Sequence, residues 1–538
     1  MPFLGRRRRH RVSASSSLTR SAGAMGVMTL LSRVFGYVRD LLQASILGAA
    51  DSADAFVIAF RIPNLFRRLV GEGALTAALV PVFTETRERQ GEEAGWRLAA
   101  TAFWTFGALL LILTGLGTLL SPSLVRMLAY GFSDISGKLD LTADLARIMF
   151  PYLLCIGLTA LVMALLNSVR VFAAPAFTPV LLNASIILFA LLAARQAEEP
   201  AYWFAVGVLV GGVLQLGFLL PFLLRRSGWL WPHFSLRDPG IRRVGRLMLP
   251  GLFGVGVTQL NLIVDSQVAS FLGTGSVSYL YYAVRVEELV LGVFVISLST
   301  AILPALSRFV LQGRNDLVKA TVIRTLRFVT FVTVPATVGL CILRWPIIAT
   351  LFQRGQFTAE DVGLTSFAMA FYALGLMPNG FVKILAPAFY AHQNTATPVR
   401  VGAVAFIVHI PLSIGLAWWL GHGGIALSTS IAAAINAAGL FYLLRRREGP
   451  GWVRPLAISF GRTLGAAVAM GLVLIWMLDW ADFPARAGLG ARAGTLALLI
   501  LAGSAVYLIT ARLLGAREGG QIWADLRGQS ASGHPEGL

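Results

Sequence analysis

The sequence predicts an all-α polytopic membrane protein with about fourteen transmembrane helices. Of its 538 residues, 56% are hydrophobic and only 13% are charged, and the mean hydropathy is +0.73. Long apolar windows recur along the chain and are separated by short loops. A bundle of membrane-spanning helices requires this composition, whereas a soluble domain rarely has it. We expect two six-helix lobes in a pseudo-twofold arrangement, followed by two C-terminal helices.

The apolar windows place each span and divide the chain into domains. The predicted spans cover residues 22–49, 54–81, 98–121, 141–168, 177–195, 201–224, 246–272, 277–303, 321–343, 362–390, 400–420, 423–444, 456–478 and 493–511. The predicted domains are a basic N-terminal tail at 1–21, an N-lobe at 22–224, a basic linker at 225–245, a C-lobe at 246–444, two final spans within 445–511 and a C-terminal tail at 512–538.

A weak internal repeat supports the division into two lobes. LTAALVP ending at Pro81 resembles LSTAILP ending at Pro304, and AFTPVLL around Pro179 resembles TATPVRV around Pro398. The two copies in each pair are separated by nearly the same length of chain. Because six spans lie between the copies, the halves should share one membrane orientation and be related by an axis along the membrane normal.

The distribution of charge predicts the orientation of the chain. The net charge is +19, which in a soluble protein can indicate nucleic-acid binding. Here most Lys and Arg residues lie in short loops and tails, and with the amino terminus inside, the cytoplasmic ones hold most of them. The positive-inside rule therefore explains the excess, and no nucleic acid is expected. Both termini and the linker at 225–245 are then cytoplasmic. Cys155 and Cys341 lie in apolar stretches away from other thiols, so neither a disulfide nor a metal site is expected.

Residues 25–85 are apolar enough to cross a membrane twice yet contain many ionisable side chains. An ionised group at bilayer depth costs on the order of 2.5–3.5 kcal/mol, so these groups must face a cavity. The polar residues of the first helix fall within a sector of roughly 120°, and those of the second within about 80°. The sector of the first helix contains Thr29, Ser32, Arg33, Gly36, Arg39, Asp40 and Gln43. That of the second contains Asp54, Arg61, Asn64, Arg68 and Glu72, with Arg67 to one side.

Within the first two predicted spans, 22–49 and 54–81, five arginines face three carboxylates. Ion pairs that only tie helices together would suit equal numbers of each sign, so the excess favours an anionic ligand over a purely structural role. In the eighth span Arg285 and Glu288 share a face. Here binding of an anionic ligand and a purely structural role are evenly balanced, because a pair at this spacing can neutralise itself. Asp265 in the seventh span could be a coupling-ion ligand, a hydrogen-bond acceptor between helices or a titrating group.

No catalytic or nucleotide-binding motif accompanies these charges. The chain contains no HExxH, no GxSxG and no phosphate-cradling GxxxxGK[ST] loop. Its loops are short, whereas membrane-embedded transferases usually carry their catalytic residues on sizeable aqueous loops. The sequence therefore favours a transporter over an enzyme and encodes no ATP-driven motor.

Several segments resemble the MurJ (MviN) family of lipid II flippases, in the multidrug/oligosaccharidyl-lipid/polysaccharide exporter superfamily. The matching segments are SRVFGYVRD at 32–40, ADAFVIAFRIPNLFRRLVGEGALTAALVPVF at 53–83, GSVSYLYYAVRVEEL at 275–289, LFQRGQF at 351–357 and LAPAFYAHQNTATPV at 385–399. The resemblance implies a lipid II flippase of the bacterial inner membrane. It would move the undecaprenyl-pyrophosphate-linked peptidoglycan precursor to the periplasmic leaflet by alternating access.

The resemblance also implies roles for individual residues. The diphosphate would be bound by Arg33, Arg39, Arg67 and Arg285, with Ser32, Asp40, Asp54, Asn64, Arg68, Glu72 and Glu288 supporting the cavity. The last two spans would form a groove for the lipid tail. We expect a monomer that contacts membrane lipids and takes lipid II as substrate, with cell-wall synthesis or division proteins as candidate partners.

Two departures from the family pattern bear on coupling and specificity. Val284 stands where family members often have an acid. Asp265 matches a sodium-site position of some relatives, but the eleventh span has no carboxylate, which argues against sodium coupling. No cofactor is expected, and a counter-ion or the membrane potential could drive transport. The rival interpretations are a drug or O-antigen-type exporter of the same superfamily and a non-transporting scaffold for wall-synthesis enzymes.

Overall fold

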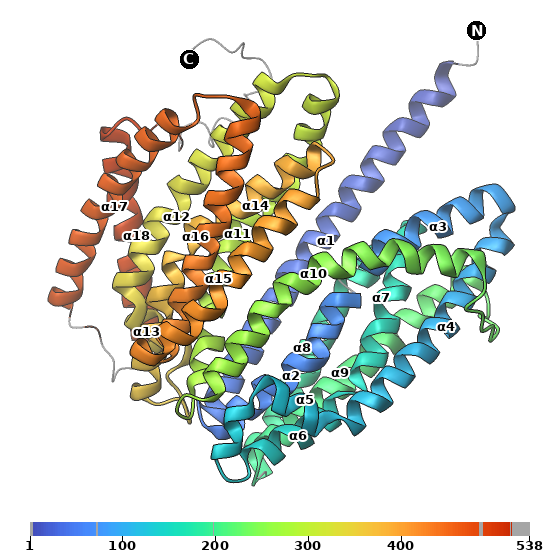
Figure 1. The fold of residues 1–538 in the computed structure, drawn as a ribbon, viewed down its shortest axis with the longest axis horizontal. Coiled ribbons are helices and arrows are strands. Elements are labelled where there is room, and N and C mark those ends of the chain that lie inside the picture. Colours follow the sequence, from blue (N-terminus) through green and yellow to red (C-terminus); the bar gives the residue numbers. More distant parts are fainter. Residues whose placement is uncertain are drawn as a thin grey trace. The chain divides into compact units, whose positions relative to one another are not determined.

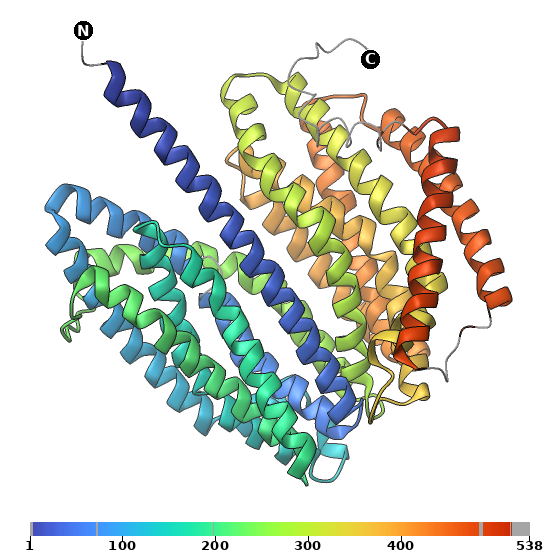
Figure 2. The ribbon, with the colours of Figure 1, turned by 180° about the vertical axis from the view of Figure 1, so that it is seen from behind.

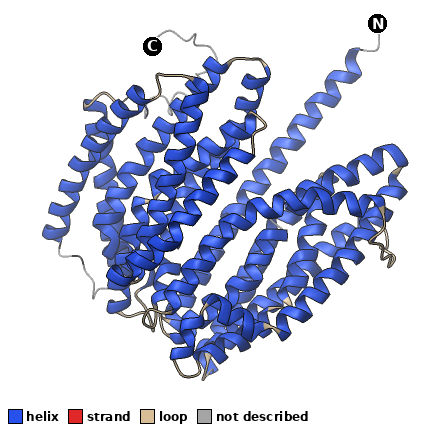
Figure 3. Ribbon diagram, in the orientation of Figure 1, coloured by secondary structure: helices blue, strands red, loops and turns tan. Residues whose placement is uncertain are grey.

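The computed structural model describes residues 4–70, 74–196, 198–481, 483, 488–516 and 518. Within these residues the chain consists of helices joined by loops and contains no strand (Figure 3), which confirms the predicted all-α class. Contact between helices divides the chain into two compact units. Unit 1 is Met1–Gly275 with Arg354–Phe357, and unit 2 is Ser276–Gln353 with Thr358–Leu538.

Unit 1 is built from ten α-helices and one short 3-10 helix in the described residues (Figure 1). They are α1 (Leu4–Leu47), α2 (Asp51–Val70), α3 (Ala74–Gln90), α4 (Glu92–Leu119), α5 (Ser121–Leu128), η1 (Tyr130–Asp134), α6 (Lys138–Met149), α7 (Tyr152–Ser168), α8 (Ala173–Gln196), α9 (Pro200–Ser227) and α10 (Pro239–Ser270). Helix α8 packs between α1 and α9, α2 packs on α6, and α10 packs on α3.

The core of unit 1 forms where α3, α4, α7, α9 and α10 meet. Fully buried side chains include Leu79 and Phe83 from α3, Leu165 from α7, Leu219 from α9 and Val244 from α10. Burying a Leu, Val or Phe side chain contributes about 1.5–3 kcal/mol. This cluster therefore holds the first turns of α10 against α3.

Unit 2 contains eight helices in its described part (Figure 2). They are α11 (Ser276–Leu311), α12 (Asn315–Phe352), α13 (Ala359–Leu374), α14 (Leu376–Ala391), α15 (Ala396–Leu420), α16 (His422–Glu448), α17 (Val453–Ala481) and α18 (Leu489–Leu513). Helices α17 and α18 pack on each other and on α12, and Tyr507 donates a 2.6 Å hydrogen bond from Oη to the Phe331 carbonyl.

Every predicted span overlaps a helix or a consecutive pair of helices, but the number of membrane crossings is not confirmed. Among the described residues, nine helical segments are long and apolar enough to cross a membrane, or ten if α13 and α14, which are bent by 41°, form one span. Helices α1, α2, α10 and α11 are not in this set. Helix α2 illustrates the reason, because it carries Asp51, Asp54, Arg61, Arg67 and Arg68 within 20 residues.

The predicted lobes and the observed units divide the chain differently. The C-lobe is predicted to begin at residue 246, whereas the contact-based boundary lies after Gly275, which groups α10 with unit 1. The packing of α10 on α3 explains this grouping. The lobe division rests on the sequence repeat, which the contacts do not test, and it stays a prediction.

Candidate functional site

Arg39 is held on α1 by a network that reaches α8. Its Nε and Nη2 donate to Asp40 Oδ1 at 3.0 and 2.7 Å, and its Nη1 donates to Asn183 Oδ1 at 3.0 Å. Asn183 Nδ2 in turn donates to the Ser32 carbonyl at 3.3 Å. Sequence reasoning missed Asn183, although an amide inside the apolar span at 177–195 was a signal for it. The network fixes the direction of the Arg39 guanidinium.

The other arginines of unit 1 differ in exposure. Arg33 is exposed on α1, and Arg67 and Arg68 are half-buried on α2. Arg67 donates from Nε to Asn64 Oδ1 at 2.7 Å, one helical turn earlier. Within the described part of the chain, Arg68 Nε is buried without a hydrogen-bond partner. Arg61 donates to the Ser266 hydroxyl on α10.

Asp54 belongs to a buried ion cluster at the start of α2. Lys138 Nζ lies 2.8 Å from Asp54 Oδ2 and 2.8 Å from Asp51 Oδ1, and the Gly275 N–H donates to Asp54 Oδ2 at 2.8 Å. Thr274 donates to Asp51 Oδ1. The Lys138 ammonium also lies 4.3 Å from the centre of the Phe132 ring. Sequence reasoning selected Asp54 but neither Lys138 nor Asp51.

The same contacts set the ionisation of Asp51. Burial by itself raises the pKa of this carboxyl, but hydrogen bonds from Lys138 and Thr274 and the positive charge of Lys138 outweigh it. The pKa of Asp51 is therefore held below its ordinary value. The cluster joins the start of α2, the start of α6 and the chain that follows α10.

Arg285 in unit 2 is bound within its own helix, α11. Its Nη1 lies 2.7 Å from Glu288 Oε2, and its guanidinium lies 4.7 Å from the centre of the Tyr281 ring. The neighbouring Glu287 is buried and accepts a 3.0 Å hydrogen bond from Asn379 Nδ2 on α14. The ion pair expected from the spacing of Arg285 and Glu288 is therefore present. The Glu288 side chain is about half exposed.

Asp265 and Glu72 are two further predicted residues, and His409 is a polar residue of the apolar span predicted at 400–420. Asp265 lies half-buried on α10, next to Ser266, and its role in ion coupling stays a prediction. Glu72 lies outside the described residues. His409 is fully buried on α15. In the described ranges, no group of three or more His, Cys, Asp or Glu side chains could hold a metal ion.

Unit 2 also has an apolar cavity of about 400 Å³ formed by α12, α14, α16 and α17. Its lining includes Phe381 from α14, Phe441 from α16 and Phe460 from α17. Thr330 is its one hydroxyl-bearing side chain among the described residues. The cavity therefore suits a hydrocarbon chain better than a polar group.

A family model described as "Lipid II flippase MurJ" matches residues 43–483. The chain belongs to the lipid II flippase MurJ family. This confirms the resemblance found in the motifs, and it confirms the expectation of a transporter rather than an enzyme, since the family consists of flippases.

Individual relatives match over nearly their whole length. A Vibrio cholerae protein named "Probable lipid II flippase MurJ" is 40% identical over 513 residues, which cover 94% of this chain and 98% of that protein. A Burkholderia cenocepacia protein named "Lipid II flippase MurJ" is 36% identical over 481 residues, covering 87% of this chain and 92% of its own.

Solved structures agree with the family assignment. A structure titled "Lipid II flippase MurJ, inward closed conformation" matches with a TM-score of 0.76 and 26% identity, covering 94% of this chain and 99% of that one. An inward-facing transporter of the MATE family matches with a TM-score of 0.66 at 16% identity, covering 77% of this chain and 94% of its own. The second likeness concerns the fold alone.

Proposed function

We propose that this protein is a lipid II flippase that moves the undecaprenyl-pyrophosphate-linked peptidoglycan precursor from the cytoplasmic to the periplasmic leaflet, for cell-wall synthesis. The observation that carries the proposal is the end-to-end similarity to the Vibrio cholerae relative named for this activity. The protein would reside in the inner membrane as a monomer with both termini in the cytoplasm. Cell-wall synthesis or division proteins are its candidate partners.

Arg33, Arg39, Arg67 and Arg285 bind the diphosphate in this proposal. A guanidinium donates charge-assisted, often bidentate hydrogen bonds to phosphate oxygens, which suits a pyrophosphate that has left water. The ion pair of Asp54 supports the cationic character of this region. Because the Asp54 carboxylate is paired with Lys138, it neutralises less of the positive charge of the arginines. Asp40 and Glu288 hold Arg39 and Arg285 in place when no substrate is bound.

Transport would proceed by alternating access between two lobes. An inward-open state admits the headgroup while the lipid tail stays in the membrane, and neutralisation of the arginines by the diphosphate favours closure. A membrane potential negative inside favours outward movement of an anion by about 2.3 kcal/mol per charge per 100 mV. Either this potential or a counter-ion resets the empty transporter.

The polyprenyl tail has a candidate location in unit 2. The last two helices, α17 and α18, pack on α12 and expose large apolar side chains such as Leu472, Trp476 and Leu501. The apolar cavity beside α17 adds a surface for a hydrocarbon chain. A tail held there would remain in an apolar environment while the headgroup crosses.

Native mass spectrometry of the purified protein with added lipid II tests the diphosphate assignment. We expect Arg67→Ala and Arg285→Ala each to weaken lipid II binding by tenfold or more, since a charged hydrogen bond contributes about 1.5–3 kcal/mol. Arg446→Ala, an exposed arginine at the end of α16, serves as the matched control and should bind as the wild type does. Polyprenyl pyrophosphate without sugars should compete weakly if the headgroup is also recognised.

Unchanged lipid II binding in both folded variants would contradict the arginine assignment. Wild-type protein that binds no lipid II would contradict the flippase proposal itself and favour a scaffold for wall-synthesis enzymes. A scaffold would tolerate neutral substitutions at the arginines as long as the helices pack.

A further inference from the structure

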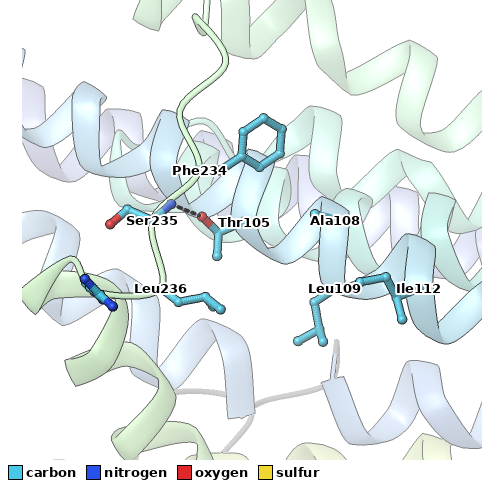
Figure 4. Close-up of a pocket in the computed structure, with 8 residues that line it drawn as sticks. Thr105, Ala108, Leu109, Ile112, Phe234, Ser235 and Leu236 are labelled. Atoms are coloured by element: carbon cyan, nitrogen blue, oxygen red, sulfur yellow. Dashed lines mark hydrogen bonds between the residues drawn. The ribbon is translucent and has the colours of Figure 1, made fainter.

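The linker between α9 and α10 is fixed on the side of α4. Trp104 donates from Nε1 to the Leu230 carbonyl at 3.0 Å, and the Ser235 N–H donates to Thr105 Oγ1 at 3.1 Å (Figure 4). The Phe234 and Trp104 rings meet edge to face with their centres 5.9 Å apart. Two hydrogen bonds and a ring contact thus hold this part of the linker against the helix.

A cleft of about 490 Å³ lies between the linker and α4. Ala108, Leu109 and Ile112 line it from successive turns of α4 (Figure 4). From the linker, Leu236 and Arg237 line it. The cleft therefore combines a hydrocarbon floor with a cationic side chain.

The floor of the cleft faces the place where membrane lipid is expected. Helix α4 is long and apolar enough to cross a membrane, and Leu109 and Ile112 are 48% and 60% exposed. Large apolar side chains that are exposed on such a helix contact acyl chains. At 1.5 Å per residue, Thr105 lies about 10 Å along α4 from residue 98, where the span is predicted to begin. This depth lies inside the hydrocarbon, which suits an acyl chain, and a long arginine side chain such as that of Arg237 can extend from there toward the headgroups.

The charge of the linker selects the headgroup. Among the described residues, Arg237 forms no ion pair, and the exposed Arg225 and Arg226 at the end of α9 form none either. The one acid of the 225–246 stretch, Asp238, is occupied as the N-cap of α10, because its Oδ1 accepts from the N–H groups of Gly240 and Ile241. Positive charge therefore remains available to a phosphate.

Exposed aromatic side chains of the same linker support this position in the membrane. Trp229 and Trp231 are 67% and 74% exposed. Tryptophan is enriched at the level of the headgroups, where its apolar ring and polar N–H are both accommodated. The linker would thus lie in the membrane interface and not in bulk water.

We propose that this cleft binds one anionic membrane phospholipid, with an acyl chain on Ala108, Leu109 and Ile112 and the headgroup phosphate at Arg237. The site is separate from the arginines assigned to the substrate and does not depend on what the protein transports. Under the proposed orientation the lipid comes from the cytoplasmic leaflet, which is the leaflet rich in anionic lipid.

The test is native mass spectrometry of the full-length protein with phosphatidylglycerol and phosphatidylcholine of identical acyl chains. We expect the wild type to retain one phosphatidylglycerol more firmly than phosphatidylcholine. Arg237→Gln should weaken this retention about tenfold, as loss of a charge-assisted hydrogen bond predicts. The matched control is Arg246→Gln, since Arg246 is exposed on α10 and does not line the cleft.

A second pair of variants tests the acyl-chain contact. Ala108→Phe fills the floor of the cleft and should abolish firm retention of phosphatidylglycerol. Leu116→Phe changes an exposed residue of α4 outside the cleft and should not. Thermal unfolding establishes that all four variants fold.

Three results would overturn the proposal. Equal weakening by Arg237→Gln and Arg246→Gln would indicate a diffuse electrostatic layer without a site. Equal retention of the two phospholipids would exclude selection by charge. One-for-one displacement of the phosphatidylglycerol by lipid II, abolished by Arg237→Gln, would assign the cleft to the substrate.

Discussion

The Nζ atom of Lys138 lies 2.8 Å from Oδ2 of Asp54, and each of these side chains is only 1% exposed. A buried charge without a partner has a large desolvation free energy. Pairing Lys138 with Asp54 offsets this free energy for both side chains. The pair joins α6 to α2 across 84 residues of sequence. The pair therefore holds α6 against α2, in a region where the other basic residues are arginines.

Lys138→Met should destabilise the protein strongly. The change leaves the Asp54 carboxyl buried without its ion-pair partner, which typically costs about 3–5 kcal/mol. In the double variant with Asp54→Asn, much of that loss should be recovered, because the only carboxylate left without Lys138 is that of Asp51, which is 44% exposed and so remains hydrated. Thermal unfolding in detergent measures both. If the double variant lost as much stability as the two single variants together, the residues would not be coupled.

Asp51 should make stability depend on pH in acid. Its pKa in the folded protein lies below its ordinary value, so the carboxylate stabilises the fold fully above the ordinary pKa. This contribution is lost as the pH falls through the lowered folded pKa. Below about pH 4 the melting temperature of the wild type should fall more steeply than that of Asp51→Asn. Parallel curves for the two proteins would contradict the assignment.

Gly355→Ala should destabilise unit 1. Gly355 has a φ of +56°, and a Cβ added there would lie 2.1 Å from the Ser45 carbonyl oxygen at the end of α1. Backbone strain of this kind costs about 1–3 kcal/mol. Gly363→Ala, within α13, meets no atom within 4 Å and should be neutral or slightly stabilising. Thermal unfolding compares the two variants, and equal melting temperatures would contradict the close approach.

Asn183→Leu should lower stability and lipid II affinity together. The substitution removes the acceptor for Arg39 Nη1 and the donor to the Ser32 carbonyl, at about 1–3 kcal/mol for buried groups left unpaired. Asn183→Asp keeps the acceptor and should retain more lipid II binding than Asn183→Leu. Native mass spectrometry with lipid II measures the difference. Equal binding by the two variants would remove Asn183 from the support of Arg39.

The helices of this fold could be predicted from the sequence because hydrophobic windows report burial in lipid directly. The interruptions could not. The apolar pattern predicts one span at 362–390, yet the chain bends by 41° between Leu374 and Leu376, where α13 ends and α14 begins. Glycine is common in membrane helices, so Gly375 gave no distinct signal for this bend. The short helices α5 and η1 lie in a stretch whose apolar content was too limited for a span.

The site was predictable only where partners are close in sequence. The spacing of Arg285 and Glu288 suggested their ion pair, and helical periodicity placed Arg39 beside other polar residues of α1. The same periodicity grouped Asp54 with the arginines of α2, whereas its observed ion-pair partner is Lys138. A single lysine at the start of a span usually indicates an interfacial charge, so nothing in the local pattern identified Lys138.

The assignment of Arg354–Phe357 to unit 1 has a genetic consequence. The Gln356 N–H donates to the Ser45 carbonyl at 2.8 Å, so these four residues belong structurally with α1. A gene divided after codon 275 would encode one fragment lacking part of its own unit and a second fragment carrying that part as a surplus loop. The first fragment would therefore be an incomplete folding unit, whereas the second would contain all of unit 2.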